Sequence, residues 1–555
     1  MIKTQKYNST GILSLMVGVV LCLTQGAVIA QTLERPNIVM VLADDMRWDY
    51  LAAMKANNLV KTPNLDALAA EGTLFSNAFV TSAICTPSRT SILTGMYERK
   101  HGVTFGSKSV MTEEAFANTY PMLLRKNGYY TGWVGKNHTP IGKTEKGVGY
   151  KSGVMDASFD YWQAGHGHLT FYPKKNHSIF KNAEANNQID IIQETIDGFM
   201  NADVAEQTAH RFLHTRPKDQ PFCLMVNFNV PHSSSTNSMK QLSDDPELYR
   251  SAYRDQMAQL EPPADYIPYE GIKTPKLPKR VYNGEYLNSY AWVKTEEALK
   301  ENQIRTLQTV TGMDLVVGNL VEELKKQGVF DNTIIVFTSD HGLFHGEYGL
   351  GGKTFLYDID LKVPLIIYAP GISKRKVVEE LCLNIDIAPT LLDFAGIAIP
   401  EGMQGRSLKP LLQKTDKKWR KDFFSENMFM QQNYPRTEAV RTKDWKYIRY
   451  FDKAKDQHHV LSLIAPILGE EPIYEELYHL KTDPYERNNV AGQPANQTIL
   501  ESLRKRCALL LTEAKGDAEL PPTYIEDMDN EKLRDSVEVA YKRLKTLMSQ
   551  SKKDK

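Results

Sequence analysis

The chain has 555 residues, of which 42% are hydrophobic and 24% charged, and its 67 Lys and Arg residues equal its 67 Asp and Glu residues. This composition is typical of a globular protein, and the zero formal net charge excludes a global attraction for nucleic acid or for an anionic membrane. The length exceeds what one compact core needs, so we expect one large domain and a smaller one.

The first residues have the composition of a signal peptide. Lys3 and Lys6 precede an apolar run at residues 11–23, and modest or small side chains lead to Ala30. The run is short for a bilayer span and is followed by polar residues. We therefore predict cleavage near Ala30, a periplasmic or secreted protein, and no stable membrane span in the mature chain.

Short apolar runs alternate with segments of helical periodicity. The strand candidates are residues 37–42, 222–228, 333–337 and 364–368, with a weaker one at 129–134. A helix is predicted from Thr62 to Glu71, where Pro63 follows an N-cap threonine and Gly72 ends the pattern, and another from about Gln303 to Gln327. This alternation predicts an α/β fold with a largely parallel or mixed sheet.

The composition changes near residues 414–420. Beyond them, residues 439–441 and 446–450 are predicted antiparallel strands, and 530–548 a charged amphipathic helix. The resulting division is a signal peptide at 1–30, an N-terminal domain at 31–418, a C-terminal subdomain at 419–515 and a charged helical tail at 516–555. Within the N-terminal domain, the polar, proline-rich segment 233–302 is expected to be a long surface connection.

Acidic residues follow two of the strongest strands directly. Asp44 and Asp45 come after the strand that ends at Ala43, and Asp340 and His341 come after the strand that begins at Thr333. Ligands of open α/β sheets bind beyond the carboxyl ends of the strands. Adjacent carboxylates repel one another unless a cation neutralises them, and their hard oxygens suit calcium or magnesium. A solvated acidic turn is the alternative for either pair alone.

Cys85 stands apart from the other cysteines because of its neighbours. Pro87 and Ser88 suit the first turn of a helix, which places Cys85 at a helix N-terminus and Arg89 one turn later. The dipole and the guanidinium would both favour an anion there. From the residues alone, Cys85 is either a thiolate nucleophile or a buried structural cysteine. The remaining cysteines of the mature chain are scattered and are expected to be small core residues: Cys223, Cys382 and Cys507.

The Cys85-x-Pro-x-Arg89 pattern resembles the signature of the type I sulfatases, the formylglycine-dependent family of the alkaline phosphatase superfamily. Further motifs follow in the family's order between about residues 36 and 491. They are Asp44-Asp45, Gly135-Lys136-Asn137-His138, Val230-Pro231-His232, Ser339-Asp340-His341-Gly342, Gly352-Lys353-Thr354, Val363-Pro364-Leu365, Asp386-Ile-Ala-Pro-Thr-Leu391, Leu477-Tyr478 and Asp483-Pro484-x-Glu486. The chain departs from the family at Asn137, where Trp is frequent, at His341, where many members have Asn, and at Asp358, where Glu is usual.

The resemblance implies an alkaline-phosphatase-like fold, with a large, mostly parallel sheet between helices and a smaller C-terminal α+β domain. It also implies that a maturation enzyme oxidises Cys85 to formylglycine. One calcium ion would be held by the modified side chain together with four other residues: Asp44, Asp45, Asp340 and His341.

The resemblance further implies a mechanism of sulfate ester hydrolysis. One hydroxyl of the hydrated formylglycine, near the metal and Arg89, would attack sulfur, and His232 would protonate the leaving oxygen. The second hydroxyl would then lose its proton, with His138 as the candidate base, and the aldehyde would re-form with expulsion of sulfate. Lys136 and Lys353 would hold the sulfate oxygens.

The predicted substrate is a sulfated poly- or oligosaccharide, such as algal ulvan or a glycosaminoglycan. His166 and His168 are weaker candidates for substrate contacts, and Glu426 and Arg436 are weaker still. Three other functions stay open: a phosphodiesterase or phosphonate monoester hydrolase of the same superfamily, a catalytically silent carbohydrate-binding relative, and a cysteine hydrolase that uses the Cys85 thiolate.

Overall fold

Strands made almost wholly of buried residues form the middle of the largest sheet. In the computed structural model, β1 (Asn37–Asp44), β9 (Phe222–Pro231) and β10 (Thr333–Ser339) are buried along their whole length. Such continuous apolar runs are typical of strands that helices cover on both faces. The structure describes residues 35–106, 109–166, 209–232, 247–271, 276–278, 280–281, 293–372, 376–415, 418–429, 434–452, 458–524 and 530–553.

The sheet has eight strands in the order β15-β2-β14-β10-β1-β9-β5-β8. The five strands from β10 to β8 run parallel, whereas β14 is antiparallel to β10 and β2 is antiparallel to β14. The remaining bounds are Thr73–Phe75 for β2, Tyr130–Asn137 for β5, Tyr161–His166 for β8, Leu365–Tyr368 for β14 and Val377–Val378 for β15. The predicted mixed, mostly parallel sheet is confirmed.

The register of the parallel strands determines which residues leave the sheet together. Ala43 of β1 pairs with Ser339 of β10, and Asp44 pairs with Pro231 of β9 after an irregularity in the register. The residues that follow these pairs therefore emerge at one edge of the sheet. They are the acidic residues at the end of β1 and directly after β10, and the histidine that follows β9.

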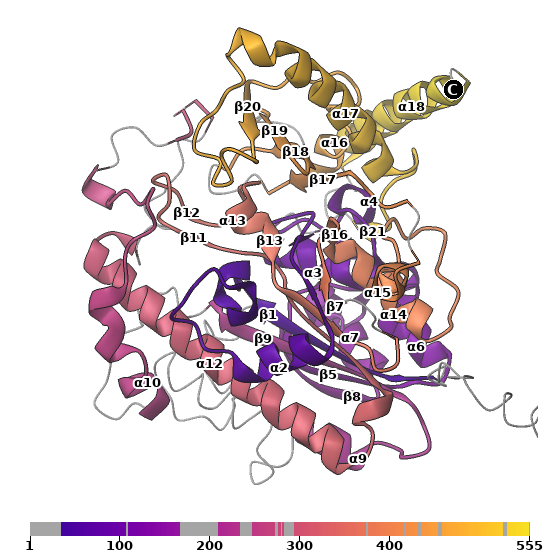
Figure 1. The fold of residues 1–555 in the computed structure, drawn as a ribbon. Coiled ribbons are helices and arrows are strands. Elements are labelled where there is room, and N and C mark those ends of the chain that lie inside the picture. Colours follow the sequence, from indigo (N-terminus) through magenta and orange to yellow (C-terminus); the bar gives the residue numbers. More distant parts are fainter. Residues whose placement is uncertain are drawn as a thin grey trace, which may run out of the picture. The chain divides into compact units, whose positions relative to one another are not determined.

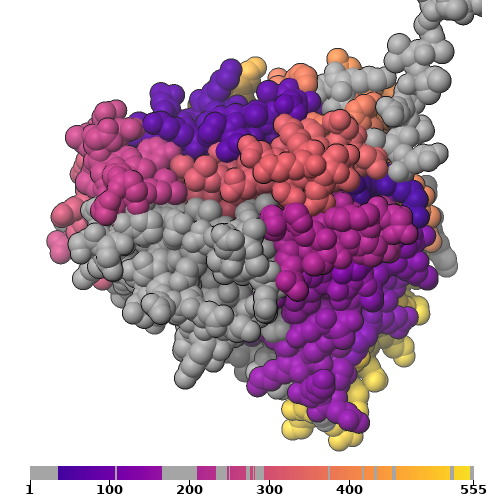
Figure 2. Space-filling model, turned by 90° about the horizontal axis from the view of Figure 1, so that it is seen from below, coloured from indigo at the N-terminus to yellow at the C-terminus, as the bar shows by residue number. Residues whose placement is uncertain are grey.

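Two helices cover one face of the sheet. α2 (Pro63–Glu71) and α12 (Glu296–Lys326) contribute Leu65 and Leu307 to a core cluster that also contains Val39 and Val41 of β1. Figure 1 shows both helices beside the large sheet, and Figure 2 shows α12 crossing the lower face of the molecule with α9 (Ala209–Thr215) next to it.

Both predicted helices are confirmed, but α12 begins seven residues before its predicted start at Gln303. Its N-cap is Thr295, whose hydroxyl accepts a hydrogen bond from the backbone N–H of Ala298. Two glutamates in the first turn further stabilise this end. The described part of the predicted surface connection also contains a short helix, α10 (Glu247–Ser251), and a 3-10 helix, η7 (Arg254–Gln259), so it is more regular than its composition indicates.

A second sheet of four antiparallel strands, in the order β17-β18-β19-β20, lies in the C-terminal part of the chain (Figure 1). Its strands are Asp422–Asn427, Thr437–Thr442, Trp445–Tyr450 and Tyr474–His479. Helix α17 (Gln497–Lys515) packs Leu503 and Cys507 against Val440 and Leu477 of this sheet. The predicted C-terminal antiparallel sheet is confirmed, and the tail forms α18 (Glu531–Lys553).

The described residues belong to one compact unit, Arg35–Lys555, and the domain limits predicted within it remain predictions. Cys223, Cys382 and Cys507 are buried and form no disulfide, as expected for small core residues. Within the described part of the chain, no helix is long and apolar enough to cross a membrane.

Candidate active site

Three carboxylates converge at the edge of the sheet where β1 and β10 end. Asp44, Asp45 and Asp340 are all buried, and each offers an oxygen within 4.8 Å of the others. The backbone N–H of Asp45 donates a 3.0 Å hydrogen bond to Asp340 Oδ1. Asp45 has a left-handed backbone with φ of 64°, which turns the chain immediately after β1. The two acidic strand ends predicted to meet therefore form one cluster.

Cys85 lies beside this cluster at the first position of helix α3 (Cys85–Thr94). Its Sγ is 3.7 Å from Asp44 Oδ1, 3.4 Å from His341 Nε2 and 3.0 Å from Lys353 Nζ. The side chain is buried. Burial alone would raise the pKa of the thiol, but the ammonium groups of Lys136 and Lys353 lower it. The predicted helix N-terminus is confirmed.

Arg89 projects from the next turn of α3 toward the same carboxylates. Its Nε donates a 2.8 Å hydrogen bond to Asp340 Oδ2, and its Nη2 lies 3.5 Å from Asp44 Oδ1. Both terminal nitrogens are buried and reach no hydrogen-bond acceptor among the described residues. Burial of unsatisfied donors is unfavourable, so these nitrogens fit a site that receives an anion.

Two lysines, one in strand β5 and one in the loop after β12 (Gly351–Gly352), also contact the carboxylates. Lys136, near the end of β5, places Nζ 2.5 Å from Asp44 Oδ2, and Lys353 places Nζ 2.9 Å from Asp45 Oδ1. The backbone N–H of Thr354 donates to Ala83 O and ties the loop after β12 to the segment before α3. Lys353 thus lies between Asp45 and Cys85, whereas Lys136 contacts Asp44.

His341 and His232 surround Asp45. The Nδ1 of His341 is 2.8 Å from the carbonyl of Gly342, which fixes Nδ1 as the donor and leaves Nε2 facing Asp45 Oδ1 at 3.2 Å. Burial would lower the pKa of His341, but Asp340 and Asp45 raise it to about 9. His232 is 3.8 Å from Asp45 Oδ2 through Nε2 and keeps 13% of its side chain exposed.

His138 lies farther back, with its ring against the edge of Phe105. It is buried, and its pKa is well below the ordinary value because burial and the nearby cations Lys136 and Arg89 oppose protonation. The imidazole is therefore neutral at physiological pH.

The pKa values of Asp44 and Asp45 are shifted in opposite directions. Burial opposes ionisation of Asp44, but Lys136, His232 and Arg89 hold its pKa well below the ordinary range. Burial raises the pKa of Asp45 to about 7 against the opposing effect of Lys353. A buried cluster of three carboxylates that includes one with a raised pKa fits a hard divalent cation, which would favour the ionised form of all three.

Serine residues that the sequence analysis did not single out hold these groups in place. Ser88 Oγ donates to the carbonyl of Asp340 and accepts from Asn384 Nδ2. Ser339 Oγ accepts from the backbone N–H of Met46 and donates to the carbonyl of His341. Ser88 directly precedes Arg89 in the sequence, and Ser339 directly precedes Asp340. This adjacency to predicted site residues could have indicated that both serines support the site.

Two of the weaker substrate candidates, Glu426 and Arg436, pair with charged residues outside the cluster around Cys85. Glu426 is buried and accepts from Arg99 Nε at 2.7 Å, and Arg436 is buried and paired with Glu470. Both side chains thus have charged protein partners, and their contact with a substrate stays a prediction. His166 ends strand β8, its side chain is not among those described, and His168 lies outside the described residues.

Comparison with known proteins agrees with this geometry. A model of the sulfatase family matches residues 36–397, and a model of the C-terminal part of N-sulphoglucosamine sulphohydrolase matches residues 346–465. The N-acetylglucosamine-6-O-sulfatase of Bacteroides thetaiotaomicron is 28% identical over 525 residues, which cover 83% of this chain and 83% of that protein. The ulvan-active sulfatase of Formosa agariphila is 27% identical over 505 residues, which cover 89% of this chain and 84% of that protein.

A solved structure shares the fold. The phosphonate monoester hydrolase of Silicibacter pomeroyi superposes with a TM-score of 0.65 at 21% sequence identity, over 85% of this chain and 94% of that one. This likeness concerns the fold alone. The family model, in contrast, matches well over half of the chain, including every residue of the cluster around Cys85. The chain therefore belongs to the sulfatase family of hydrolases.

Proposed function

We propose that the protein hydrolyses a sulfate ester on an acidic carbohydrate, by means of a formylglycine made from Cys85 and a bound calcium ion. One observation carries the proposal: Cys85, Lys353 and the unsatisfied nitrogens of Arg89 surround the same three buried carboxylates. The names of the two relatives described above, an N-acetylglucosamine-6-O-sulfatase and an ulvan-active sulfatase, favour a carbohydrate over a small aryl ester.

The calcium ion would be held by carboxylates of both strand ends, by His341 and by the modified residue 85. Asp44, Asp45 and Asp340 supply the hard oxygens that calcium prefers. When bound, the ion would supply positive charge that favours an ionised hydroxyl at residue 85. It would also compensate the carboxylates, which would leave Lys136 and Lys353 available for an anion.

The protein's own side chains would position the ester. Lys136, Lys353 and the terminal nitrogens of Arg89 would hold its sulfate oxygens, where they neutralise the charge that develops in the transition state. Arg89 is oriented for this role by its hydrogen bond to Asp340. The donors are fixed before the substrate arrives, so little reorganisation is required during the reaction.

Two histidines would move protons. His232 is partly exposed beside Asp45 and would donate a proton to the leaving sugar oxygen. His138 is neutral and buried next to Lys136, so its ring nitrogen would accept a proton as the sulfate is released.

The experiment is a side-by-side assay of the full-length protein, co-expressed with a formylglycine-generating maturation enzyme. Sulfated oligosaccharides, an aryl sulfate and a phosphodiester are supplied to the same preparation, and the peptide containing residue 85 is analysed by mass spectrometry. Conversion of Cys85 together with desulfation of a saccharide supports the proposal. Faster cleavage of the phosphodiester, or an unconverted Cys85 in a preparation that is fully active, would refute it.

We also propose that the protein acts outside the cytoplasm, in the periplasm or after secretion. The basic and apolar composition of residues 1–30 supports this localisation. Sequencing of the mature N-terminus tests it: a chain that begins near Gln31 agrees, and one that begins at Met1 in the native source contradicts it.

A further inference from the structure

A large cavity of about 950 Å³ lies apart from the cluster around Cys85. It is bounded by the segment after β1, the loop between β11 (Phe344–His345) and β12 (Gly351–Gly352), and helix α13 (Asp358–Leu361). The C-terminal sheet contributes the rest of the lining, through the turn between β18 and β19 and the segment after β20. None of the residues assigned to the catalytic cluster lines it.

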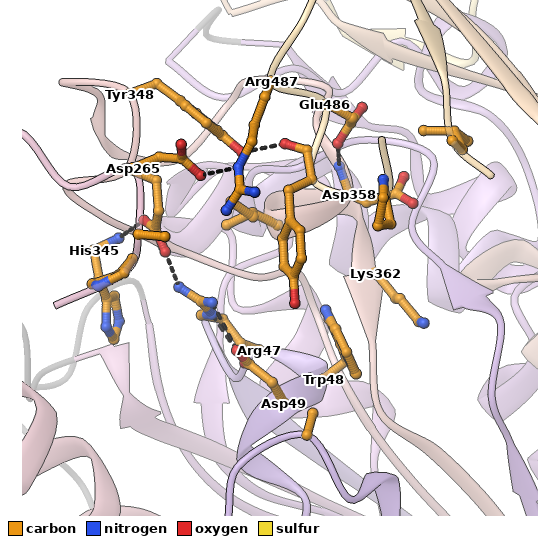
Figure 3. Close-up of a pocket in the computed structure, with 18 of the residues that line it drawn as sticks. Arg47, Trp48, Asp49, Asp265, His345, Tyr348, Asp358, Lys362, Glu486 and Arg487 are labelled. Carbon is orange, nitrogen blue, oxygen red and sulfur yellow. Dashed lines mark hydrogen bonds and ion pairs between the residues drawn. The ribbon is translucent and has the colours of Figure 1, made fainter. Parts of the chain in front are cut away.

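Aromatic rings lie on two sides of this cavity. Tyr485 exposes 55% of its surface, and the guanidinium of Arg487 lies 5.0 Å from its ring centroid. On the other side, Lys362 Nζ lies 4.2 Å from the ring centroid of Trp48. Figure 3 shows Trp48 and Lys362 across the cavity from Tyr348, whose hydroxyl donates to the carbonyl of Tyr485. Large, flat and partly exposed side chains of this kind suit the apolar face of a sugar ring.

The arginines of the cavity are already neutralised. Arg47 pairs with Asp49 and Glu347, and Figure 3 shows the pair of Arg47 and Asp49. Arg441 pairs with Asp358, and Arg487 with Asp265. Apart from Arg47 with Asp49, these ion pairs join the walls to one another, because their partners come from distant parts of the chain.

Two of the lysines that line the cavity are not neutralised. Lys443 and Lys481 form no ion pair or side-chain hydrogen bond with any described residue, whereas Lys362 lies over the Trp48 ring and its charge is favoured by Asp358. Two lining carboxylates, those of Glu261 and Asp444, likewise have no cationic partner among the described residues. The two available ammonium groups suit an anionic ligand, and the two available carboxylates can accept hydrogen bonds from hydroxyl groups.

We infer that this cavity is a second carbohydrate-binding site, which holds an acidic segment of the polysaccharide away from the catalytic cluster. The inference rests on the proposed function, since it takes the substrate to be an acidic carbohydrate. The aromatic rings contact the sugar faces, the lysines contact sulfate or carboxylate groups, and the free carboxylates accept from hydroxyls. A substrate long enough to reach both sites binds more tightly than a short one, because the second contact is intramolecular.

The test compares a cavity variant, K443Q/K481Q/Y485A, with a control variant, K505Q/K532Q, whose exposed lysines lie outside the cavity. Both are prepared as full-length protein with Cys85→Ala, so that no ligand is turned over. Each is titrated calorimetrically with a heparin-derived hexasaccharide and an ulvan-derived oligosaccharide. We expect the cavity variant to bind at least one of them about tenfold more weakly than the control. Equal affinities of the two variants for both saccharides would overturn the inference.

Chemically treated saccharides identify the group that is bound. A desulfated saccharide that keeps its carboxylates shows whether the lysines bind sulfate or carboxylate. Weaker binding after desulfation indicates that they bind sulfate, and weaker binding after carboxyl reduction indicates that they bind carboxylate. Either result supports an acidic ligand. A saccharide that is both desulfated and carboxyl-reduced is neutral. If it binds the control variant as tightly as the acidic saccharide does, the inference of an acidic ligand is overturned.

Turnover separates this inference from the proposed function. With Cys85 restored and converted, the cavity variant is expected to show a raised KM for the oligosaccharide and the control's kcat/KM for an aryl sulfate. If the control variant hydrolyses the oligosaccharide and the cavity variant does so with the same KM, the second site is absent but the enzyme is a sulfatase. If neither variant hydrolyses any sulfate ester, the proposed function itself fails.

Discussion

Arg89 donates from Nε to Asp340 Oδ2 at 2.8 Å, while its two terminal nitrogens reach no hydrogen-bond acceptor among the described residues. One end of the guanidinium is thus fixed to the residue that follows β10, and at the other end Nη2 lies 3.5 Å from Asp44 Oδ1. This arrangement orients a buried cation toward an anion before any ligand binds.

Arg89→Ala is expected to lower kcat/KM for a sulfate ester by about 10²- to 10³-fold, because an oriented donor to the sulfate is lost. It should also destabilise the protein by about 3–5 kcal/mol, because Asp340 would remain buried without its partner. Arg89→Lys is the matched variant, because it keeps the positive charge but loses the planar guanidinium with its paired donors. Compared with Arg89→Ala, it should therefore restore stability more than activity. Kinetics and urea denaturation measure both effects, and wild-type kcat/KM in Arg89→Ala would contradict the assigned role.

Cys85→Ala should abolish turnover while the protein remains folded, since a small buried side chain is exchanged for another of similar size. Cys507→Ala serves as the control, because that cysteine is equally buried but packs under the C-terminal sheet. The control should lose about 1 kcal/mol of stability and retain activity. Thermal denaturation and a sulfate ester assay compare the two, and measurable turnover by Cys85→Ala would exclude residue 85 as the nucleophile.

Chelation of calcium should lower both activity and thermal stability, because three carboxylates would then share one buried site without a divalent cation. At calcium concentrations of 100 to 1,000 times Kd, the bound ion should contribute about 3–4 kcal/mol. Asp45→Asn should reduce this calcium-dependent gain. Calorimetry with and without a chelator, together with metal analysis, measures it, and an unchanged Tm after proven loss of the metal would contradict the assignment.

Acid should destabilise the protein through His101, which is buried behind α3. Its Nδ1 accepts from the backbone N–H of Val103, and its Nε2 lies 3.1 Å from Ser91 Oγ. Burial lowers its pKa to about 3, whereas an unfolded histidine has a pKa of about 6.5.

Between these two pKa values the unfolded chain binds a proton that the native chain does not. The free energy of unfolding should therefore fall as the pH decreases from about 6.5 toward 3, with His101 contributing about 2 kcal/mol of the loss between pH 7 and 5. Urea denaturation at the two pH values tests this, with His101→Gln as the comparison. A pH dependence that is the same in both proteins would show that His101 is not responsible.

The sequence alone predicted the elements whose signals are local. The apolar run before Asp44 and Asp45 predicted a buried strand with an acidic end, and it forms β1. The prolines and glycine around residues 63–72 predicted helix α2, and the motif from Cys85 to Arg89 predicted both a helix N-terminus and the family. These elements can be predicted from the sequence because their formation depends on residues only a few positions apart.

Only the tertiary structure decided which distant groups meet. The parallel register of Ala43 with Ser339 brings Asp44 and Asp340 together across nearly 300 residues of chain. The same long-range packing pairs Arg436 with Glu470 inside the C-terminal part, and it builds the second cavity from widely separated segments. Local periodicity reports the secondary structure of a segment and which face is buried, but the partners of a buried charge depend on strand register and loop packing, which no short stretch of sequence encodes.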